Sequence, residues 1–268
     1  MAIIVHDPGP DGPDDLPVDL RHQASVIGEN KRLDTRHGQV EFFTSMKYIH
    51  DYLKPGDRIA DIGAGPGKYS LFLKQEGYDV TAVELVRPNI GMLRAKDKEI
   101  RIIEADARDL HMLKDKEFDA VILFGPMYHL YSFEDRLQAL KEAARICKRV
   151  LFVTYIMNEY ALIQYAFKEN NYSLIRDKLD KDFRICDPDG IFFQTRIEEM
   201  DELNKACGLK LLKRFAADGA TDYMRSTINQ MNEETFKAYI DFHMATCERT
   251  ELLGASSHVT DILEAAED

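Results

Sequence analysis

A glycine-rich segment at residues 61–67, Asp-Ile-Gly-Ala-Gly-Pro-Gly, has the composition of a ligand-binding loop. Gly63 and Gly65 have no Cβ atom, so the backbone there can turn tightly and approach a ligand closely. A helix that begins directly after the loop would offer unpaired N–H groups to an anionic or electron-rich group. The segment therefore predicts a binding site between a strand and a helix.

The spacing of these glycines excludes two common phosphate-binding loops. A dinucleotide fingerprint, G-x-G-x-x-G, needs a glycine where this chain has Lys68. A P-loop, G-x-x-x-x-G-K-[ST], needs one more residue before the lysine and a Ser or Thr at Tyr69. Glu84, however, lies 21 positions after Gly63, close to the roughly 20 at which a carboxylate accepts hydrogen bonds from a ribose diol. Alone, Glu84 would be assigned to an exposed strand end; with the loop, it predicts ribose binding.

Short apolar runs alternate with amphipathic stretches throughout the middle of the chain. The runs predict strands at 58–62, 79–85, 100–105, 118–124, 149–156 and 209–215. Helices are predicted at about 39–53, 67–77, 88–96 and 133–147, the last capped by Ser132, and another after Thr195, with Glu198 completing its cap. This alternation, with strands rich in Val, Ile and Leu, is typical of an α/β fold with a parallel sheet covered on both faces.

Three segments fall outside this alternation. Residues 1–20 hold four of the nine prolines and are expected to form a flexible acidic tail, which leaves 21–268 as one domain. Residues 157–194 and 216–256 are expected to be insertions. For 157–194 we expect a helix at 159–170 and a loop near 187–190. It either forms a small core of its own or caps the carboxyl edge of the sheet and lines an apolar pocket.

Five stretches together resemble the class I S-adenosylmethionine (SAM)-dependent methyltransferases. They are DIGAGPGKYS (61–70), TAVELV (81–86), IEADARDL (103–110), FGPMYHLY (124–131) and LGASSH (253–258). More narrowly, the chain resembles bacterial small-molecule-type members with a G-P-[LM]-Y-H-L stretch after the fourth strand. The resemblance covers about residues 29–258.

The resemblance implies a Rossmann-like, doubly wound, seven-stranded, mostly parallel sheet whose last strand, about 257–264, is antiparallel. It also implies SAM as cofactor and S-adenosylhomocysteine as product. The cofactor-binding residues would be Asp61, Gly63, Ala64 and Gly65 at the methionine part, Glu84 and Leu85 at the ribose, Asp106 and Ala107 at the adenine, and Phe124 and Gly125 at the sulfonium end.

The acceptor side is expected just past the fourth strand, at Tyr128 and His129. A neutral imidazole there could take a proton from an attacking hydroxyl or amine, or His129 could only line the pocket and fix the Gly125-Pro126 turn. His258 is a weaker candidate for the same role. A base typically adds about 10²–10⁴-fold, whereas orientation can supply roughly 7–11 kcal/mol of the barrier, so methyl transfer does not require an identified base.

Residues near the N-terminal helix are further candidates. Tyr48 and His50 could close over the cofactor or pack on the sheet. Arg32, Arg36 and His37 could reach a carboxylate of SAM or of an acidic substrate, or remain solvated.

The charge distribution bears on the partners. The chain has 35 Lys and Arg against 47 Asp and Glu, a net charge of −12. Residues 1–20 and 251–268 each carry −5, so the 230 residues between them are nearly neutral, with −2. No basic stripe is present and no N/D-P-P-Y/F tetrapeptide follows the fourth strand, which argues against nucleic acid as the acceptor. A small-molecule acceptor is expected.

Other composition features indicate an ordinary cytoplasmic protein. Four cysteines, Cys147, Cys186, Cys207 and Cys247, are too scattered for a zinc site or a disulfide framework. No carboxylates at short spacing indicate a metal, no apolar run reaches the roughly 18 residues of a membrane span, and no signal peptide is recognisable.

Two functions from different classes fit these features. The first is SAM-dependent methyl transfer to an O or N nucleophile of a small molecule by in-line displacement. The second is a SAM-binding regulatory or sensor module without turnover. A nicotinamide-dependent oxidoreductase is disfavoured by Lys68. Oligomeric state cannot be inferred from the sequence.

Overall fold

The computed structural model describes residues 33 and 35–265, and the expected tail at 1–20 lies outside them. Within this range a seven-stranded sheet has the order β3-β2-β1-β4-β5-β7-β6. Its strands are β1 (Arg58–Ile62), β2 (Asp79–Glu84), β3 (Arg101–Glu104), β4 (Phe118–Leu123), β5 (Cys147–Ile156), β6 (Lys210–Ala216) and β7 (His258–Glu264). All pairings are parallel except those of β7 with β5 and β6. The expected Rossmann-like sheet with an antiparallel last strand is confirmed.

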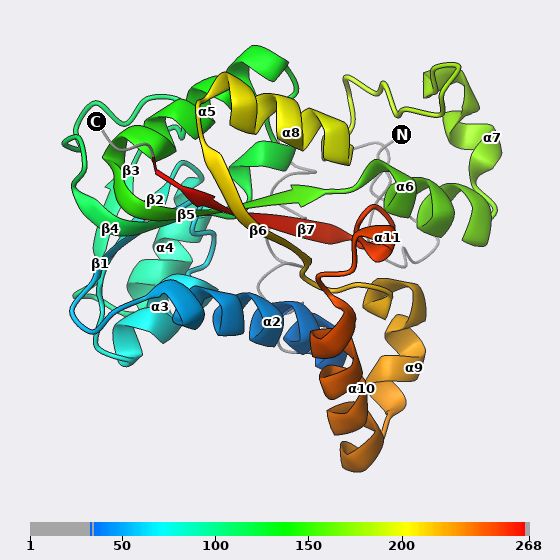
Figure 1. Ribbon diagram of the computed structural model, residues 1–268, viewed down its shortest axis with the longest axis horizontal. Helices are drawn as coiled ribbons and strands as arrows, with labels where there is room; N and C mark the ends of the chain where they lie inside the picture. The colour runs from blue at the N-terminus through cyan, green and yellow to red at the C-terminus, as the bar shows by residue number, and fades with distance from the viewer. Residues whose placement is uncertain (1–32, 34, 266–268) are drawn as a thin grey trace.

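Helices cover both faces of the sheet. α2 (Arg36–Tyr52), α3 (Lys68–Gln75) and α4 (Arg87–Lys96) lie on one face, and α5 (Phe133–Ile146) and α8 (Ile197–Ala206) on the other (Figure 1). Because both faces are covered, the central strands β4 and β5 are almost entirely buried and apolar, as their sequences indicate. The sheet order reverses between β1 and β4, where open α/β sheets bind ligands at the carboxyl edge.

Local capping explains where two of these helices begin. α2 begins at Arg36, three residues before the expected start at 39. Its N-cap, Thr35, accepts a hydrogen bond from the Gly38 N–H. Ser132 accepts one from the Asp135 N–H at the start of α5, as expected. Both contacts satisfy a donor that would otherwise be unpaired in the first turn.

The expected cap at Thr195 is wrong. The N-cap of α8 is Arg196, and no side chain caps the helix. Thr195 instead continues the sheet, because its N–H bonds the Ile156 carbonyl and its own carbonyl accepts from the Asn158 N–H. These long-range backbone bonds outweigh the local capping preference of a threonine.

The segment 157–194 forms short helices beyond the carboxyl edge. They are α6 (Asn158–Ala161), a π-helix η3 (Leu162–Lys168), α7 (Tyr172–Ile175) and a 3₁₀ turn η4 (Arg176–Lys178). The α-helix expected over 159–170 is thus only partly present, because a wider π turn replaces its second half. Tyr160 and Tyr165, five positions apart, meet with ring centroids 5.9 Å apart and both hydroxyls near Arg225.

The segment 216–256 is helical as well. It consists of η5 (Thr221–Met224), α9 (Arg225–Gln230), α10 (Glu233–Thr246) and α11 (Thr250–Leu253), and α9 and α10 extend away from the sheet beside the end of α2 (Figure 1). Val40 of α2 forms a small separate core there with Ile228 and Phe236. A further 3₁₀ turn, η2 (Pro126–Tyr128), follows β4.

Candidate active site

The glycine loop lies at the carboxyl end of β1, directly before α3. Gly63 has φ +74° and Gly65 has φ +56°, a region that L side chains rarely adopt. A Cβ on Gly63 would lie 2.5 Å from Pro126 Cδ, so the loop packs tightly against the turn after β4. A Cβ on Gly65 would meet nothing within 4 Å, so the loop backbone at that residue faces open space.

Glu84 fixes this loop to the end of β2. The Gly63 and Ala64 N–H groups donate to the Val83 carbonyl at 2.8 and 3.2 Å. The Glu84 carboxylate, 5% exposed, accepts the Gly65 N–H through Oε2 and the Val86 N–H through Oε1, both at 2.7 Å. Each carboxylate oxygen can accept a further bond, so Glu84 can hold two hydroxyls while it orders the loop.

Asp61, at the end of β1, is a second buried carboxylate of the site. It is 2% exposed and accepts a hydrogen bond from the Ser70 hydroxyl of α3. Burial raises the pKa of Asp61 to about 6, and the negative charge of Glu84 adds to this effect. Two carboxylates on neighbouring parallel strands make this edge negative, which favours a cationic ligand group.

Asp106 has a partner that sequence reasoning missed. The Arg108 guanidinium donates to both carboxylate oxygens of Asp106 and to Asp135 on α5. These bonds hold the pKa of Asp106 below its usual range. An amino group that binds Asp106 must therefore share it with Arg108. The short separation of the two residues could have indicated this contact.

Apolar side chains flank these polar groups. Leu85 is 56% exposed just past β2, and Ala107 packs against the core. Phe124 meets the Tyr69 ring edge-on at 5.1 Å, and Gly125 has φ +118°. The expected cofactor residues thus share one edge of the sheet, at the ends of β1, β2, β3 and β4.

Tyr128 and His129 form an aromatic group with Phe192 of the loop before α8. The ring centroids of Tyr128 and His129 lie 5.6 and 5.3 Å from that of Phe192. The Phe193 N–H donates to the Tyr128 carbonyl at 2.7 Å, which ties this loop to η2. His129 is exposed, whereas Tyr128 is half-buried.

A buried cluster of Glu41, Asp218 and His258 was not predicted as a unit. The three come from α2, the loop after β6 and the start of β7. His258 Nδ1 lies 2.7 Å from Asp218 Oδ2 and 3.6 Å from Glu41 Oε2. Ligand atoms of all three lie within 4.8 Å of one another, close enough for a metal ion. The expected absence of a metal site stays a prediction, since spacing along the chain could not reveal this cluster.

The candidates on the N-terminal helix α2 contact other parts of the protein. The Arg36 guanidinium contacts Glu233 and the Met231 carbonyl, and His37 contacts Asn229. Tyr48 stacks on Phe215 and donates to Glu248, and His50 contacts Glu76. These contacts agree with a structural role, and the alternative roles at the cofactor or substrate stay predictions. Arg32 lies outside the described residues.

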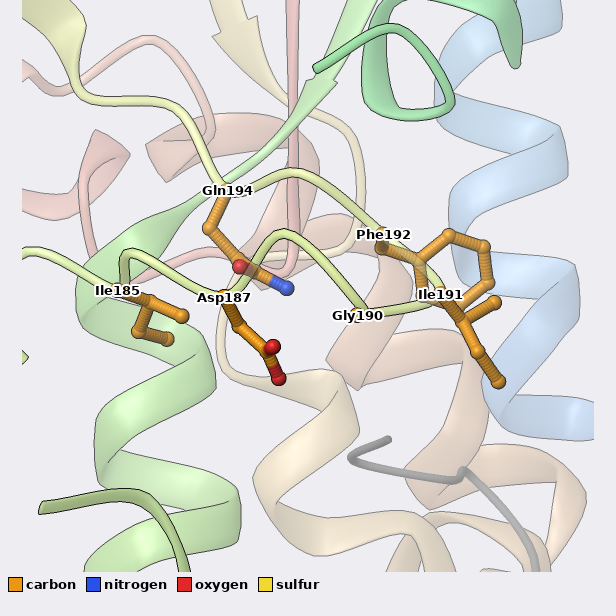
Figure 2. Close-up of a pocket in the computed structure, with 6 residues that line it drawn as sticks. All are labelled: Ile185, Asp187, Gly190, Ile191, Phe192 and Gln194. Carbon is orange, nitrogen blue, oxygen red and sulfur yellow. The ribbon is translucent and has the colours of Figure 1, made fainter. Parts of the chain in front are cut away.

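A small pocket lies beside the aromatic group rather than at the glycine loop. It is lined by Ile185, Asp187, Gly190, Ile191, Phe192 and Gln194. Figure 2 shows the Gln194 side chain extending toward Asp187, while Phe192 lies at the other end. Asp187 is paired with Lys178 at 2.6 Å. Phe192 therefore links this pocket to Tyr128 and His129, and no expected cofactor residue lines it.

The central part of the chain is similar to a known family of domains. Residues 60–150 match the family model of a methyltransferase domain. This segment holds the glycine loop, Glu84, Asp106 and the turn after β4.

Two curated relatives carry different activities in their names. The chain is 32% identical over 136 residues to probable tRNA methyltransferase 9B of Bos taurus, covering 47% of this chain and 29% of that protein. It is 28% identical over 193 residues to glycine/sarcosine N-methyltransferase of Aphanothece halophytica, covering 69% of each. The chain thus spans less than a third of the bovine relative.

A solved structure shares the fold. Magnesium protoporphyrin IX methyltransferase from Synechocystis PCC 6803, with bound S-adenosylhomocysteine, has a TM-score of 0.57 at 12% identity and covers 92% of this chain and 94% of that chain. Together these findings support a class I SAM-dependent methyltransferase fold and the expected cofactor, SAM. They do not confirm the narrower subgroup, and the tRNA methyltransferase match leaves the exclusion of nucleic acid unconfirmed.

No helix in the described part of the chain combines the length and apolar character needed to cross a membrane.

Proposed function

We propose that the chain transfers the methyl group of SAM to an O or N nucleophile of a small molecule. The observation that carries this proposal is the Glu84 carboxylate, which holds the Gly65 N–H at 2.7 Å and keeps acceptor capacity at the carboxyl edge. This arrangement suits a ribose beside a close-approach loop. The methyltransferase domain match over the same residues supports the same function.

The residues of this edge fit SAM. Asp61, Gly63, Ala64 and Gly65 would face its methionine part, Glu84 and Leu85 its ribose, Asp106 and Ala107 its adenine, and Phe124 and Gly125 its sulfonium end. The open space at Gly65 would let the loop backbone contact the methionine part of SAM. The negative charge of Asp61 would attract the ammonium group of that part. When bound, SAM supplies a methyl group already activated by the sulfonium, so the chain mainly has to hold the acceptor in line with it.

A small acceptor is favoured by the contact of one insertion with the turn after β4. The segments 157–194 and 216–256 would be parts of one domain at 21–268, and the first would act as a cap, since its Phe192 contacts Tyr128 and His129, whereas α9 and α10 of the second extend away from the sheet (Figure 1). Among the relatives, the glycine/sarcosine enzyme is named for small acceptors and matches over more of this chain than the tRNA enzyme does. Because the bovine match exists, tRNA is a second candidate acceptor.

Binding and turnover are tested separately. S-adenosylhomocysteine at 100 times its Kd should stabilise the protein by about 2.7 kcal/mol in thermal unfolding, and NAD should not. Transfer of a radiolabelled methyl group from SAM is then measured with pools of small hydroxyl and amine compounds and with total tRNA.

Each outcome assigns a function. Label in a small compound supports the proposal, and label only in tRNA supports the second candidate. S-adenosylhomocysteine binding without any label would indicate a SAM-binding regulatory module. A thermal shift with NAD alone would overturn the assignment to SAM.

A further inference from the structure

The carboxylate of Asp106 follows β3 at the same edge of the sheet as Glu84. Glu84 and Glu104, the last residues of β2 and β3, are partners in the register of the two parallel strands. The Ala105 N–H donates to the Glu84 carbonyl at 3.2 Å, so the chain stays beside β2 for one residue beyond β3. Asp106 comes next, and a nucleoside whose ribose binds Glu84 would extend its base toward Asp106.

Arg108 occupies most of the acceptor capacity of Asp106. Oδ1 of Asp106 accepts the Arg108 backbone N–H at 2.9 Å and the side-chain Nε at 3.0 Å. Oδ2 accepts Nη2 of the same guanidinium at 2.7 Å and lies 3.2 Å from Nε. A carboxylate offers about four lone-pair sites, so these donors leave room for roughly one more hydrogen bond.

The guanidinium of Arg108 is itself held in place. Its Nη1 donates to Asp135 Oδ1 at 2.9 Å. Asp135 lies in the first turn of α5, where its backbone N–H donates to the capping hydroxyl of Ser132. Because a planar guanidinium presents its donors in a fixed fork, Arg108 cannot turn without breaking bonds to two carboxylates. Asp106 is therefore held in one orientation.

This group of charged side chains remains accessible to a ligand. The side chains of Asp106, Arg108 and Asp135 are 29%, 41% and 40% exposed. A base can therefore approach Asp106 without opening the core of the protein.

Purine bases differ at the position that such a carboxylate would contact. Adenine carries an amino group at C6, which donates hydrogen bonds, and its N1 has no proton. Hypoxanthine carries an oxygen at C6, and its N1 bears a proton. A carboxylate with one fixed acceptor site binds the amino group and repels the oxygen, whereas a carboxylate that can turn could accept the N1 proton instead.

We propose that Arg108 is a positioning residue that makes the nucleobase site selective for a 6-aminopurine. It holds Asp106 with one acceptor site for the amino group and prevents the carboxylate from turning to bind a 6-oxopurine. This inference rests on the proposed function, in which Asp106 faces the base of SAM.

The charge of Arg108 contributes to the same selectivity. Its hydrogen bonds hold the pKa of Asp106 below the usual range, so Asp106 stays ionised at neutral pH. An ionised carboxylate only accepts hydrogen bonds, whereas a protonated one could donate to the oxygen of a 6-oxopurine.

The test compares two ligands that differ at C6. S-adenosylhomocysteine carries the amino group, and S-inosylhomocysteine, its deaminated analogue, carries the oxygen. The Kd of each is measured by titration calorimetry at pH 7, with the weaker ligand in competition, for wild type, Arg108→Met and Arg108→Lys. Methionine removes all the donors, and lysine keeps the charge without the fork. Arg87→Met is the control, because Arg87 is an exposed arginine that pairs with Glu104 at the same edge.

The ratio of the two Kd values is the decisive quantity. Wild type should bind S-adenosylhomocysteine about 100-fold more tightly than S-inosylhomocysteine. Arg108→Met should lower this ratio at least tenfold, Arg108→Lys should lie between the two, and Arg87→Met should stay within twofold of wild type. Asp106→Asn should also lower the ratio, because its amide can donate to the oxygen at C6.

A purely structural role of Arg108 predicts a different result. Both Kd values would then rise together in Arg108→Met and Arg108→Lys, with a ratio within threefold of wild type, and the inference would be overturned. Arg108→Lys keeps an ion pair with Asp106 and decides the question if Arg108→Met does not fold. Equal binding of both ligands by wild type, or an unchanged ratio in Asp106→Asn, would also overturn it. Failure of S-adenosylhomocysteine to bind the wild type would instead refute the proposed function itself.

Discussion

The replacement of Glu84 by glutamine tests the cofactor site most directly. Glu84 holds the Gly65 and Val86 N–H groups at 2.7 Å and would also accept two ribose hydroxyls. Glutamine keeps the size of the side chain but turns one acceptor oxygen into a donor, and it removes the negative charge. One ribose bond is then lost, and the other becomes a neutral hydrogen bond.

The size of the effect follows from these bonds. A hydrogen bond to a charged group contributes about 1.5–3 kcal/mol and a neutral one about 0.5–1.5 kcal/mol. Losing one charged bond and weakening another should cost about 2–4 kcal/mol of binding, which corresponds to roughly a 30- to 1,000-fold higher Kd for S-adenosylhomocysteine. Titration calorimetry at pH 7 measures this change directly.

Glu104→Gln is the matched control. Glu104 pairs with Glu84 in the register of β3 and β2, but it is half-exposed and bound to Arg87. The Glu104→Gln variant should bind S-adenosylhomocysteine with a Kd within about twofold of wild type, since an exposed ion pair contributes little. A Glu84→Gln protein that is folded and binds S-adenosylhomocysteine within threefold of wild type would refute the ribose assignment.

Three further predictions concern stability in urea unfolding. Gly63→Ala should cost about 2–5 kcal/mol, because its Cβ would press on Pro126 at 2.5 Å and φ is +74°; a cost below 0.5 kcal/mol would contradict the packing. Asp61 has a folded-state pKa of about 6 against an ordinary 3.8, so the stability it contributes is full below about pH 4 and is lost as pH rises to 6. Asp61→Asn should remove up to about 3 kcal/mol of this pH-dependent loss in the free energy of unfolding. A variant with the same pH profile as wild type would contradict the raised pKa of Asp61. Arg214→Leu should cost about 3–5 kcal/mol, because it leaves the fully buried Asp261 without its ion pair; an unchanged midpoint would show that the pair contributes nothing.

Sequence reasoning succeeded where the signal is local. The apolar runs predicted β1, β2 and β4 to within a residue at each end, because their burial on both faces demands continuous apolar side chains. The spacing of the glycines and Glu84 predicted one site, because a strand, a helix and the next parallel strand return the chain to the same edge.

Local reasoning failed where a distant segment competes for the same groups. Thr195 has the composition of a helix cap, but Ile156 and Asn158 engage its backbone. The outcome there depends on which partner the fold brings within hydrogen-bonding distance. The expectation that Asp106 faces adenine stays a prediction, and its pairing with Arg108, two positions away, was missed although it is local.

The sequence by itself determined the sheet, its binding loop and the identity of the residues at the carboxyl edge. Only the tertiary structure decided which histidine lies among carboxylates. His129 ends the turn η2 after β4 and is exposed, while His258 meets Asp218, 40 positions away, and Glu41 on α2. The physical reason is that β7 inserts antiparallel between β5 and β6, which brings its first residue to the edge where parallel strands end.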